Sequence, residues 1–542
     1  MPLRPDHPRP LPLADIAARL GVPAPSGAAA AGTAAGTAVT GITHASGQVR
    51  PGDLYAALPG ARTHGARFAG QAAAAGAVAV LTDPAGLPLA RPVGLPVLVV
   101  RSPREVLGEV ADLVYGEPTA ALPVLGVTGT SGKTTTVYLL EAGLAAAGRT
   151  TGLVGTVETR MAGRAVPSAL TTPEATDLHA TFAAMREAGV DAVAMEVSSH
   201  ALALGRVGGV RFEVGGFTNL SQDHLDFHAD LEDYFAAKRR FFDGRCRVEV
   251  VNADDPYGRR LVRPATVTVS AAGDPGATWC ASDVSGVARD TYRATPGTRL
   301  AGGGSSFVVH GPDGFRAAGG IRLPGAYNVA NALLAVAMLA AAGVDPAVAV
   351  AAMAEVQVPG RMERVDAGQP YLAVVDYAHK PDAVAAALAA LRPMTKGRLI
   401  VVLGCGGDRD RGKRPLMGTA AARGADLVVV TDDNPRSEDP AAIRAAMAAG
   451  VRAVPNADWL EVGDRAQAIA EAVGRAGPGD TVLVAGKGHE QGQDVAGVVH
   501  PFDDRVVLRA AIEARRRRVS IAARDERGAQ RARSRADDEA AR

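Results

Sequence analysis

The sequence predicts an α/β protein of three domains: a small α/β N-terminal domain, a central domain built on a parallel sheet with added β-hairpins, and a C-terminal Rossmann-like domain. Three observations support this prediction. The chain has 542 residues, and ~100–200 residues per domain gives about three domains. Short apolar runs alternate with helical stretches along most of the chain, which is the order of βαβ units. A hydrophobic fraction of 47% and a charged fraction of 21% are those of a globular protein.

The predicted N-terminal domain covers residues 1–121. Its first residues are rich in proline, and the apolar runs AVAVLTD and VLVV then alternate with alanine-rich stretches that suit helices. We therefore expect a small α/β unit that ends near Ala121.

The predicted central domain covers residues 122–354. Apolar runs predict strands at 123–128, 151–156, 191–197 and 213–219, and periodic stretches predict helices at 133–147, 175–188 and 231–242. Residues 265–322 are rich in Val, Thr and Gly, which indicates hairpins attached to this domain, and a further helix is expected at 327–342.

The predicted C-terminal domain covers residues 355–518. Strands are expected at 371–376, 398–404, 425–431 and 481–486, with helices at 381–392, 413–423, 440–450 and 464–475. This alternation is typical of a doubly wound sheet. Residues 519–542 are rich in Arg and Ala, and we expect them to form a disordered charged tail.

Charge and cysteine usage exclude several classes of protein. Ten Arg and five acidic residues from Arg515 to Arg542 give this segment a net charge of +5, so the remainder carries −4. A mildly acidic folded region argues against a nucleic-acid-binding protein. Three scattered cysteines form neither a disulfide framework nor a metal cluster, and no apolar run reaches the ~18–20 residues that span a bilayer. We expect a cytoplasmic protein with no membrane insertion.

The segment Gly126–Thr136 reads GVTGTSGKTTT and lies between a predicted strand and a predicted helix. This is the context of a phosphate-binding P-loop, in which backbone N–H groups and a helix N-terminus face phosphate oxygens. Lys133 would reach the β- and γ-phosphates, and the Thr134 hydroxyl would bind Mg²⁺. The strict pattern places Gly at 127, where this chain has Val127. The segment predicts a P-loop ATPase-type sheet that binds ATP or GTP.

Polar clusters follow six of the predicted strands, where ligands bind in open α/β sheets. They are Glu196–His200, Thr218–Asp226, Asp376–Lys380, residues 404–415, Asp432–Arg436 and Gly486–Glu490. About half could be helix caps or turns. Only six of the 58 basic residues are lysines, and five lie in or beside these clusters: Lys133, Lys238, Lys380, Lys413 and Lys487. Lysine can lose its proton and arginine cannot, so amine chemistry or geometry is expected there.

The clusters of the C-terminal domain carry both signs of charge. Arginine binds a carboxylate and acidic side chains bind an ammonium group, so an amino acid would satisfy both. ATP, an amino acid and a second substrate held elsewhere indicate amide-bond formation through an acyl phosphate.

Nine motifs place the chain beside a known family. GVTGTSGKTTT, EVSSHAL, TNLSQDHLDFH, LPGAYNVAN, GRMERV, DYAHKPD, GCGGDRDRGKRP, DDNPR and AGKGHE occur in this order over roughly residues 40–510. The chain resembles the ATP-dependent Mur ligases. The resemblance implies that the N-terminal domain holds a UDP-sugar, the central domain ATP and the C-terminal domain an amino acid. The implied reaction adds meso-2,6-diaminopimelate to UDP-N-acetylmuramoyl-L-alanyl-D-glutamate and gives ADP and phosphate, in peptidoglycan precursor synthesis.

The resemblance also implies roles for single residues. The ATP site would comprise Gly126, Thr128, Gly129, Thr130, Ser131, Gly132, Lys133, Thr134, Thr135, Asn328, Arg361 and Asp376. The UDP-muramoyl-peptide site would comprise His44, Ser46, Ala61, Arg62, Thr63, Thr171, Thr172, Ser198 and Arg206, with Leu204 where the family often has Gln. The diaminopimelate site would comprise Arg409, Asp433, Asn434, Pro435, Arg436, Gly486 and Glu490.

Two Mg²⁺ ions are implied as well. Thr134 and Glu196 would hold one, and His224 with a carbamylated Lys238 (N6-carboxylysine) would hold the other. The catalytic group would then be Lys133, Glu196, His224 and Lys238. A carbamate forms when a neutral amine reacts with CO₂, which arginine cannot do.

Arg436 decides between related substrates. Diaminopimelate has a second carboxylate at its far end, where L-lysine has only an ammonium group that a guanidinium would repel. A lysine-adding or D-Ala-D-Ala-adding Mur ligase and a folylpolyglutamate synthase remain alternatives, which DNPR and GCGGDRD disfavour. A nucleotide-binding regulator or scaffold is an alternative of another class. We expect a monomer whose partners are the three small-molecule substrates.

Overall fold

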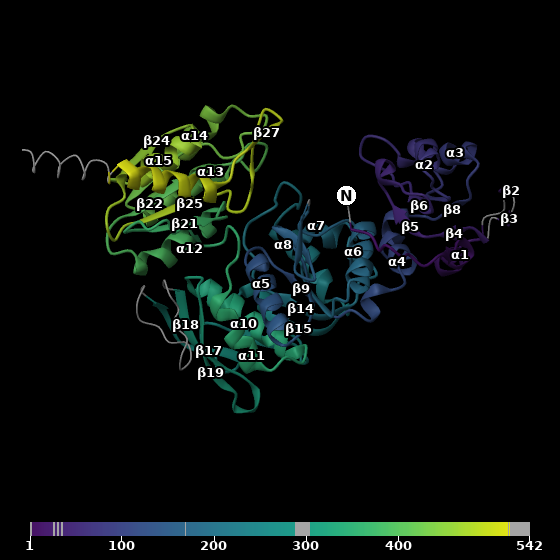
Figure 1. Cartoon of the computed structure of the whole chain (residues 1–542), viewed down its shortest axis with the longest axis horizontal. Coiled ribbons are helices and arrows are strands. Elements are labelled where there is room, and N and C mark those ends of the chain that lie inside the picture. Colours follow the sequence, from purple (N-terminus) through teal and green to yellow (C-terminus); the bar gives the residue numbers. More distant parts are fainter. Residues whose placement is uncertain are drawn as a thin grey trace, which may run out of the picture.

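The computed structural model describes residues 3–24, 28–29, 32–33, 36–168, 170–287, 304–518 and 520. The chain folds into three lobes, each built around its own sheet (Figure 1). Apart from residue 520, the predicted tail 519–542 lies outside the described residues. Among the described residues, no helix is both long and apolar enough to cross a membrane.

The N-terminal lobe has a four-stranded parallel sheet in the order β5 (Gly41–Thr43), β6 (Asp53–Ala56), β7 (Ala79–Thr82) and β8 (Val97–Val99). Helices cover both faces of this sheet. Alternate side chains of a strand point to opposite faces, so each strand packs against helices on both sides. Leu54 and Ala56 pack with α1 (Leu13–Leu20) and α4 (Pro103–Val114), whereas Tyr55 and Ala57 pack with α2 (Ala69–Ala74) and α3 (Leu87–Ala90).

The central lobe is an eleven-stranded sheet in the order β12-β11-β10-β13-β9-β14-β15-β16-β17-β18-β19. The strands from β10 to β17 pair in parallel, and antiparallel strands continue the sheet at both edges. The parallel strands are β10 (Thr151–Val154), β13 (Ala192–Glu196), β9 (Val124–Thr128), β14 (Phe212–Phe217), β15 (Cys246–Asn252), β16 (Val267–Ser270) and β17 (Trp279–Val287). This parallel order confirms the predicted βαβ series.

The hairpins predicted within residues 265–322 extend one edge of this same sheet. After β17, the chain adds β18 (Gly304–His310) and β19 (Arg316–Ile321) in antiparallel pairing. The opposite edge carries a hairpin of β11 (Glu158–Met161) and β12 (Arg164–Pro167), which was not predicted. One face packs on α5 (Lys133–Ala146), α10 (Ala326–Ala341) and α11 (Pro346–Ala352), while α6 (Ala175–Glu187), α7 (Ser199–Ala203) and α8 (Leu231–Arg239) flank the other.

The C-terminal lobe has a six-stranded sheet in the order β20-β21-β25-β22-β23-β24. Its parallel strands are β21 (Leu372–Asp376), β25 (Thr481–Ala485), β22 (Leu399–Leu403), β23 (Leu427–Val430) and β24 (Trp459–Glu461), and β20 (Glu363–Arg364) is antiparallel. One face packs on α12 (Pro381–Leu391), α13 (Lys413–Gly424) and α14 (Pro440–Arg452). The other face packs on α15 (Arg465–Arg475) and a helix at 504–518. The doubly wound prediction is confirmed, although β24 was missed.

Local sequence signals explain where several helices begin. The side chains of Asp230, Asp439 and Asp464 each accept a hydrogen bond from a backbone N–H in the first turn of α8, α14 and α15. Such caps satisfy donors that have no partner inside the helix. Pro440 at the first helical position of α14 fits because its missing N–H would be unpaired there.

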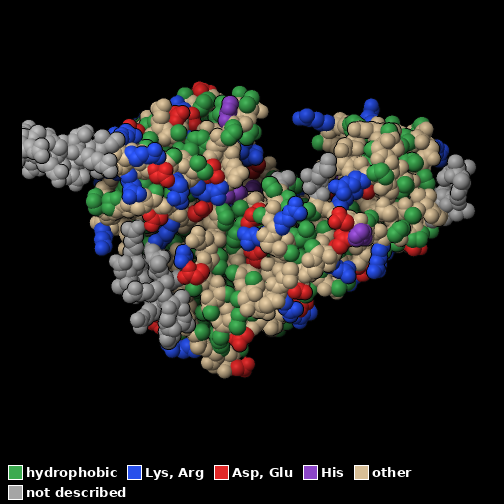
Figure 2. Space-filling model, in the orientation of Figure 1, with side chains coloured by type: hydrophobic (Ala, Val, Ile, Leu, Met, Phe, Trp, Pro, Cys, Tyr) green, Lys and Arg blue, Asp and Glu red, His purple; other side chains and the backbone are tan. Residues whose placement is uncertain are grey.

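The lobes surround a wide hollow between the N-terminal and C-terminal lobes, with the central lobe at its base (Figure 2). The carboxyl end of β9 in the central lobe and those of β21, β22, β23 and β25 in the C-terminal lobe carry most of the predicted site residues. Contacts of Arg361 with Thr134 and of Lys380 with Asp223 join the two lobes near the carboxyl end of β9.

Candidate active site

The P-loop has the conformation that its glycines allow. Gly129 and Gly132 have φ angles of +146° and +89°, which L side chains rarely adopt. A Cβ at Gly129 would lie 1.9 Å from Thr218 Oγ1, and one at Gly132 would lie 2.3 Å from Asn331 Oδ1. Val127, in contrast, is a fully buried residue of β9. The loop therefore needs glycine at 129 and 132, which explains the departure from the strict spacing at 127.

The segment that follows β14 fixes the loop from the side. Ser131 N–H donates to Asn219 Oδ1 at 3.1 Å, and the Ser131 carbonyl accepts from Thr218 Oγ1 at 2.7 Å. Thr130 Oγ1 lies 3.2 Å from the Tyr234 hydroxyl and accepts from Ser221 N–H at 3.0 Å. The loop is thus held in place by protein groups of the central lobe.

Two lysines meet at this loop. Lys133 Nζ donates to the carbonyl oxygens of Gly129 and Thr130 at 2.9 and 3.0 Å, and Lys238 Nζ donates to the same Gly129 oxygen at 2.7 Å. Lys238 is 1% exposed and its Nζ lies 4.5 Å from the Tyr234 ring centroid. Burial lowers the pKa of Lys133 to about 8, and burial together with nearby Lys133 holds the pKa of Lys238 well below its usual range. The neutral amine that a carbamate requires is therefore favoured at Lys238.

Thr134 and Glu196 form an oxygen-rich pair beside the loop. Thr134 Oγ1 donates to Glu196 Oε1 at 3.0 Å, and Thr156 donates to Glu196 through its N–H at 2.8 Å and its hydroxyl at 3.1 Å. Hydroxyl and carboxylate oxygens are the ligands that Mg²⁺ prefers. No group of three or more His, Cys, Asp or Glu in the described part of the chain could hold a metal by itself. Thr134 and Glu196 could therefore supply two of the oxygen ligands of a Mg²⁺ ion.

His224 follows β14 in a left-handed conformation, with a φ of +53°. Its Nε2 lies 3.0 Å from Asp223 Oδ2, and its ring lies edge-on to His200, with centroids 4.8 Å apart. Burial lowers the pKa of His224 to about 4, so the ring is neutral near pH 7. Donation from Nε2 to a carboxylate leaves Nδ1 unprotonated, which is the arrangement of histidines that bind metals.

The remaining predicted ATP residues reach the loop from α10 and from the C-terminal lobe. Arg361 Nη2 donates to Thr134 Oγ1 at 3.3 Å, and its guanidinium lies 4.2 Å from the Tyr377 ring centroid. Asp376 accepts from two backbone N–H groups at 2.7 Å each, and burial raises its pKa while Arg361 opposes the shift. Asn328 Oδ1 accepts from Asn331, whose side chain also borders Gly132.

Four of the predicted muramoyl-peptide residues form one cluster. Thr172 Oγ1 donates to the Glu196 carbonyl at 2.9 Å and lies 3.4 Å from Ser198 Oγ. Arg206 Nη1 donates to the Thr172 carbonyl at 3.3 Å, and Thr171 Oγ1 lies 3.0 Å from Thr156 Oγ1. The cluster therefore contacts Glu196, one member of the Thr134–Glu196 pair, directly. Leu204 is the C-cap of α7 and lies beside this cluster in the chain.

The predicted uridine-side residues lie in the N-terminal lobe. His44 Nδ1 lies 3.3 Å from Thr176 Oγ1 of α6, which connects the lobe to the central lobe, and burial lowers the pKa of His44. Ser46 begins a 3₁₀ turn two residues later. Ala61, Arg62 and Thr63 form an exposed turn closed by the bridge between Pro59 and His64, separate from the His44 contact.

The predicted amino-acid residues meet at the ends of β23 and β25. Asn434 Nδ2 donates to Glu490 Oε2 at 2.8 Å, and Lys487 Nζ donates to Asn434 Oδ1 at 3.0 Å and lies 3.2 Å from the same Glu490 oxygen. Lys487 is fully buried. A Cβ at Gly486 would lie 2.6 Å from Asp433 Oδ2, so this position requires glycine.

Arg436 and Arg409 differ in how firmly they are held. Arg436 has a φ of +51° and donates from Nη1 to the Gly407 carbonyl at 2.7 Å. Its backbone pairs with the hairpin of β26 (Gly492–Val495) and β27 (Val498–Pro501), accepting from Ala496 N–H and donating to the Asp494 carbonyl. Pro435 precedes it in the same turn. Arg409 is exposed and donates to the Asp408 carbonyl at 3.1 Å.

Sequence reasoning missed several residues that organise this site. Lys487 was noted as a retained lysine, but its buried position between Asn434 and Glu490 was not predicted. Gln493 supports the pocket by donating to the Asp433 carbonyl at 2.7 Å, and the Arg465 guanidinium is fully buried and pairs with Asp504 at 2.7 Å. Lysine retention was the one sequence signal for this group, and it pointed only to Lys487.

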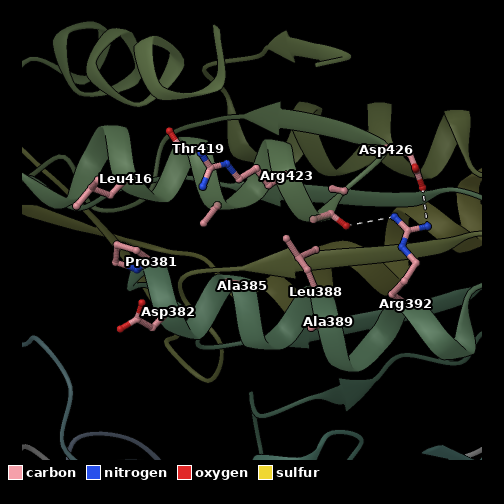
Figure 3. Close-up of a pocket in the computed structure, with 13 residues that line it drawn as sticks. Pro381, Asp382, Ala385, Leu388, Ala389, Arg392, Leu416, Thr419, Arg423 and Asp426 are labelled. Atoms are coloured by element: carbon pink, nitrogen blue, oxygen red, sulfur yellow. Dashed lines mark hydrogen bonds and ion pairs between the residues drawn. The ribbon is translucent and has the colours of Figure 1, made fainter. Parts of the chain in front are cut away.

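Two surface grooves lie away from the predicted site residues. One, of about 680 Å³, runs between α12 and α13 and is lined by Leu388, Leu416 and Arg423, with the Arg392–Asp426 ion pair at one end (Figure 3). The other, of about 720 Å³, lies where residues 119–123 connect the first two lobes.

Comparison with known proteins gives the same assignment along the chain. Residues 38–115 match the Mur ligase family catalytic domain, residues 127–339 the Mur ligase middle domain, and residues 360–488 the Mur ligase glutamate ligase domain. Among solved structures, a UDP-N-acetylmuramoyl-L-alanyl-D-glutamate–2,6-diaminopimelate ligase aligns with a TM-score of 0.62 at 30% identity, over 94% of this chain and 100% of its own. A MurF ligase from Thermotoga maritima in complex with ADP aligns at 18% identity with a TM-score of 0.59, over 88% of this chain and 97% of its own, and shares the fold.

Curated relatives are closer in sequence. A UDP-N-acetylmuramoyl-L-alanyl-D-glutamate–2,6-diaminopimelate ligase of Streptomyces avermitilis is 58% identical over 94% of this chain and 98% of its own length. The ligase of the same description from Corynebacterium glutamicum is 52% identical over 85% of this chain and 89% of its own. The chain therefore belongs to the Mur ligase family.

Proposed function

We propose that this protein is an ATP-dependent amide ligase that adds meso-2,6-diaminopimelate to UDP-N-acetylmuramoyl-L-alanyl-D-glutamate, giving ADP and phosphate, in peptidoglycan precursor synthesis. The names of relatives 52–58% identical to this chain support this substrate pair. One structural observation carries the proposal. The P-loop of the central lobe contacts the C-terminal lobe through Thr134 and Arg361, and the loop after β14 contacts it through Asp223 and Lys380.

The proposed chemistry has two steps. A carboxylate oxygen of the D-glutamyl side chain attacks the γ-phosphorus of ATP, so that an acyl phosphate forms and ADP leaves. The amine of diaminopimelate then attacks the acyl carbon, forms the C–N bond, loses a proton and displaces phosphate. Bound Mg²⁺ would neutralise phosphate charge in the first step. Thr134 and Glu196 would hold one ion, and His224 and carbamylated Lys238 would hold a second.

The residues of this chain would position the two reacting groups. Lys133 and the loop N–H groups would hold the β- and γ-phosphates, which stabilises charge on the transferred group. Thr172 and Arg206 would hold the muramoyl-peptide beside Glu196, and His44 would contact the uridine diphosphate end. Glu490 would accept hydrogen bonds from the ammonium group of the amino acid.

The fixed guanidinium of Arg436 supports diaminopimelate over L-lysine. Its backbone pairs with the β26–β27 hairpin and its side chain donates to the Gly407 carbonyl, which places a positive charge where it would repel a lysine ammonium group. We also propose that the enzyme acts in the cytoplasm as a monomer; its three free cysteines are compatible with a reducing compartment.

Phosphate release tests this proposal. Phosphate should appear only when ATP, the UDP-muramoyl-dipeptide and meso-diaminopimelate are all present, and replacing diaminopimelate by L-lysine should abolish most of it. Release that does not depend on the amino acid would indicate a nucleotide hydrolase and contradict the ligase assignment. Equal rates with L-lysine would contradict the role of Arg436.

A further inference from the structure

We infer that Lys380 is a positioning residue that docks the C-terminal lobe on the phosphate site, so that the acyl phosphate reacts with the amino acid and not with water. This inference rests on the function proposed above. Lys380 is the N-cap residue of α12 and is 8% exposed. Its Nζ lies 2.6 Å from Asp223 Oδ2, which belongs to the loop after β14 of the central lobe. The ion pair therefore joins two lobes.

Asp223 extends this contact into the phosphate site. The same oxygen, Oδ2, lies 3.0 Å from Nε2 of His224, the residue that would hold the second Mg²⁺. One carboxylate oxygen thus contacts an ammonium group from one lobe and an imidazole from the other. Docking of the C-terminal lobe and the orientation of His224 are therefore linked through a single side chain.

The other side of Lys380 is tied to the amino-acid pocket. Lys413 begins α13 directly after the loop that carries Arg409, and its Nζ donates to the His379 carbonyl at 3.0 Å. His379 precedes Lys380 in the chain. The loop that carries Arg409 is thus connected to Lys380 through Lys413 and His379, and from Lys380 to Asp223.

The pair favours the docked arrangement of the lobes. When the lobes are together, Lys380 and Asp223 are shielded from water and their attraction is strong, whereas in water such a pair contributes little. Without Lys380, docking would bury the Asp223 carboxylate beside the polyphosphate without an ammonium group to offset the cost of its desolvation. Removal of the ammonium group should therefore shift the population toward separated lobes.

The acyl phosphate can react in two ways, which differ in their products. In the docked state, the amine forms a C–N bond, the bond from the acyl carbon to the phosphate oxygen breaks, and a proton is released. When the lobes are apart, water attacks the same carbon and restores the D-glutamyl carboxylate. Both routes release one phosphate, but only the first makes tripeptide. The ratio of phosphate released to tripeptide formed therefore measures docking and not folding.

The test compares Lys380→Met with Lys396→Met in the full chain, supplied with ATP, UDP-muramoyl-dipeptide and meso-diaminopimelate. Lys396 is exposed on the same lobe and serves as the matched control. Wild type and Lys396→Met should give a ratio near one. Lys380→Met should form tripeptide about tenfold more slowly with a ratio of about three or more, as expected for a shifted docking equilibrium. A ratio that stays at one overturns the inference, whatever the rate.

A second variant guards against misfolding. Lys380→Gln removes the charge but keeps a polar side chain. The ratio of phosphate to tripeptide is taken from whichever variant has the same midpoint of thermal unfolding as wild type. A different result would contradict the proposed function itself: phosphate release by wild type that does not require diaminopimelate. The inference on Lys380 fails when wild type behaves as a ligase and the charge-neutral variant remains fully coupled.

Discussion

The side-chain nitrogens of Lys133 and Lys238 both donate to the carbonyl oxygen of Gly129, at 2.9 and 2.7 Å. Burial disfavours the charged form of Lys238, and repulsion from the nearby Lys133 ammonium group adds to this effect, so the pKa of Lys238 is held well below its usual range. Conversion of Lys238 to a carbamate would replace this repulsion with attraction to Lys133. The geometry thus favours the modified lysine that the family resemblance implies.

The first prediction concerns this modification. Lys238→Ala should lose nearly all ligase activity, and short carboxylic acids such as acetate should restore part of it by replacing the carbamate oxygens. Lys238→Arg should be inactive without rescue, since a guanidinium forms no carbamate and fills the space. Tripeptide formation with and without added carboxylate is the measurement. Full activity of Lys238→Ala would contradict a metal-binding role.

The second prediction concerns the Thr134–Glu196 pair. Glu196→Gln removes an anionic ligand, so the Mg²⁺ concentration for half-maximal ADP formation should rise about tenfold or more. Glu471→Gln, an exposed glutamate paired with Arg475 on α15, provides the control and should leave the Mg²⁺ titration unchanged. An unchanged titration for Glu196→Gln would show that the ion is held elsewhere.

The third prediction concerns the amino-acid pocket. Arg436→Ala should raise KM for diaminopimelate by about 100-fold and KM for ATP by little, because a charge-assisted contact to a carboxylate is lost. Arg423→Ala, which changes the groove between α12 and α13, should alter neither constant (Figure 3). Equal increases in both KM values for Arg436→Ala would indicate a general structural defect.

Local patterns could be predicted from the sequence, and contacts between distant segments could not. The P-loop was recognisable because strand, glycine loop and helix are consecutive, and the Asp432–Arg436 cluster because it follows an apolar strand. The Lys380–Asp223 ion pair could not be predicted from the sequence, because it depends on how two lobes pack against each other. The β26–β27 hairpin that supports Arg436 was missed for a related reason: its strands are only four residues long and exposed or half-buried, so they lack an apolar signal.

The same distinction applies to the sheets. The antiparallel extension β17–β19 was predicted as hairpins from its turn residues, but its union with the parallel sheet depends on the pairing of β16 with β17, which involves only two residue pairs. Domain boundaries near residues 121 and 354 remain predictions drawn from composition. The roles of Ala61, Arg62 and Thr63 also remain predictions, since their exposed turn has a defined shape but does not share the His44 contact with the central lobe.

The last prediction concerns pH and stability. His379 is half-buried just before the N-terminus of α12, where its Nδ1 donates to the Tyr377 carbonyl at 2.7 Å. Desolvation, together with the nearby ammonium groups of Lys380 and Lys413, lowers its pKa to about 3. In the unfolded chain the pKa is about 6.5, so between these values the unfolded state binds more protons and stability falls as the pH is lowered. At pH 5.5 this amounts to about 1.4 kcal/mol relative to pH 7.5.

His379→Asn keeps a donor for Tyr377 but does not titrate. The variant should therefore lose about 1.4 kcal/mol less stability than wild type between pH 7.5 and pH 5.5. Urea unfolding at the two pH values gives the measurement, and His500→Asn, an exposed histidine of β27, should behave as wild type. If His379→Asn and wild type lost equal stability, His379 would have to bind its proton in the folded protein, which would contradict a neutral imidazole at this position.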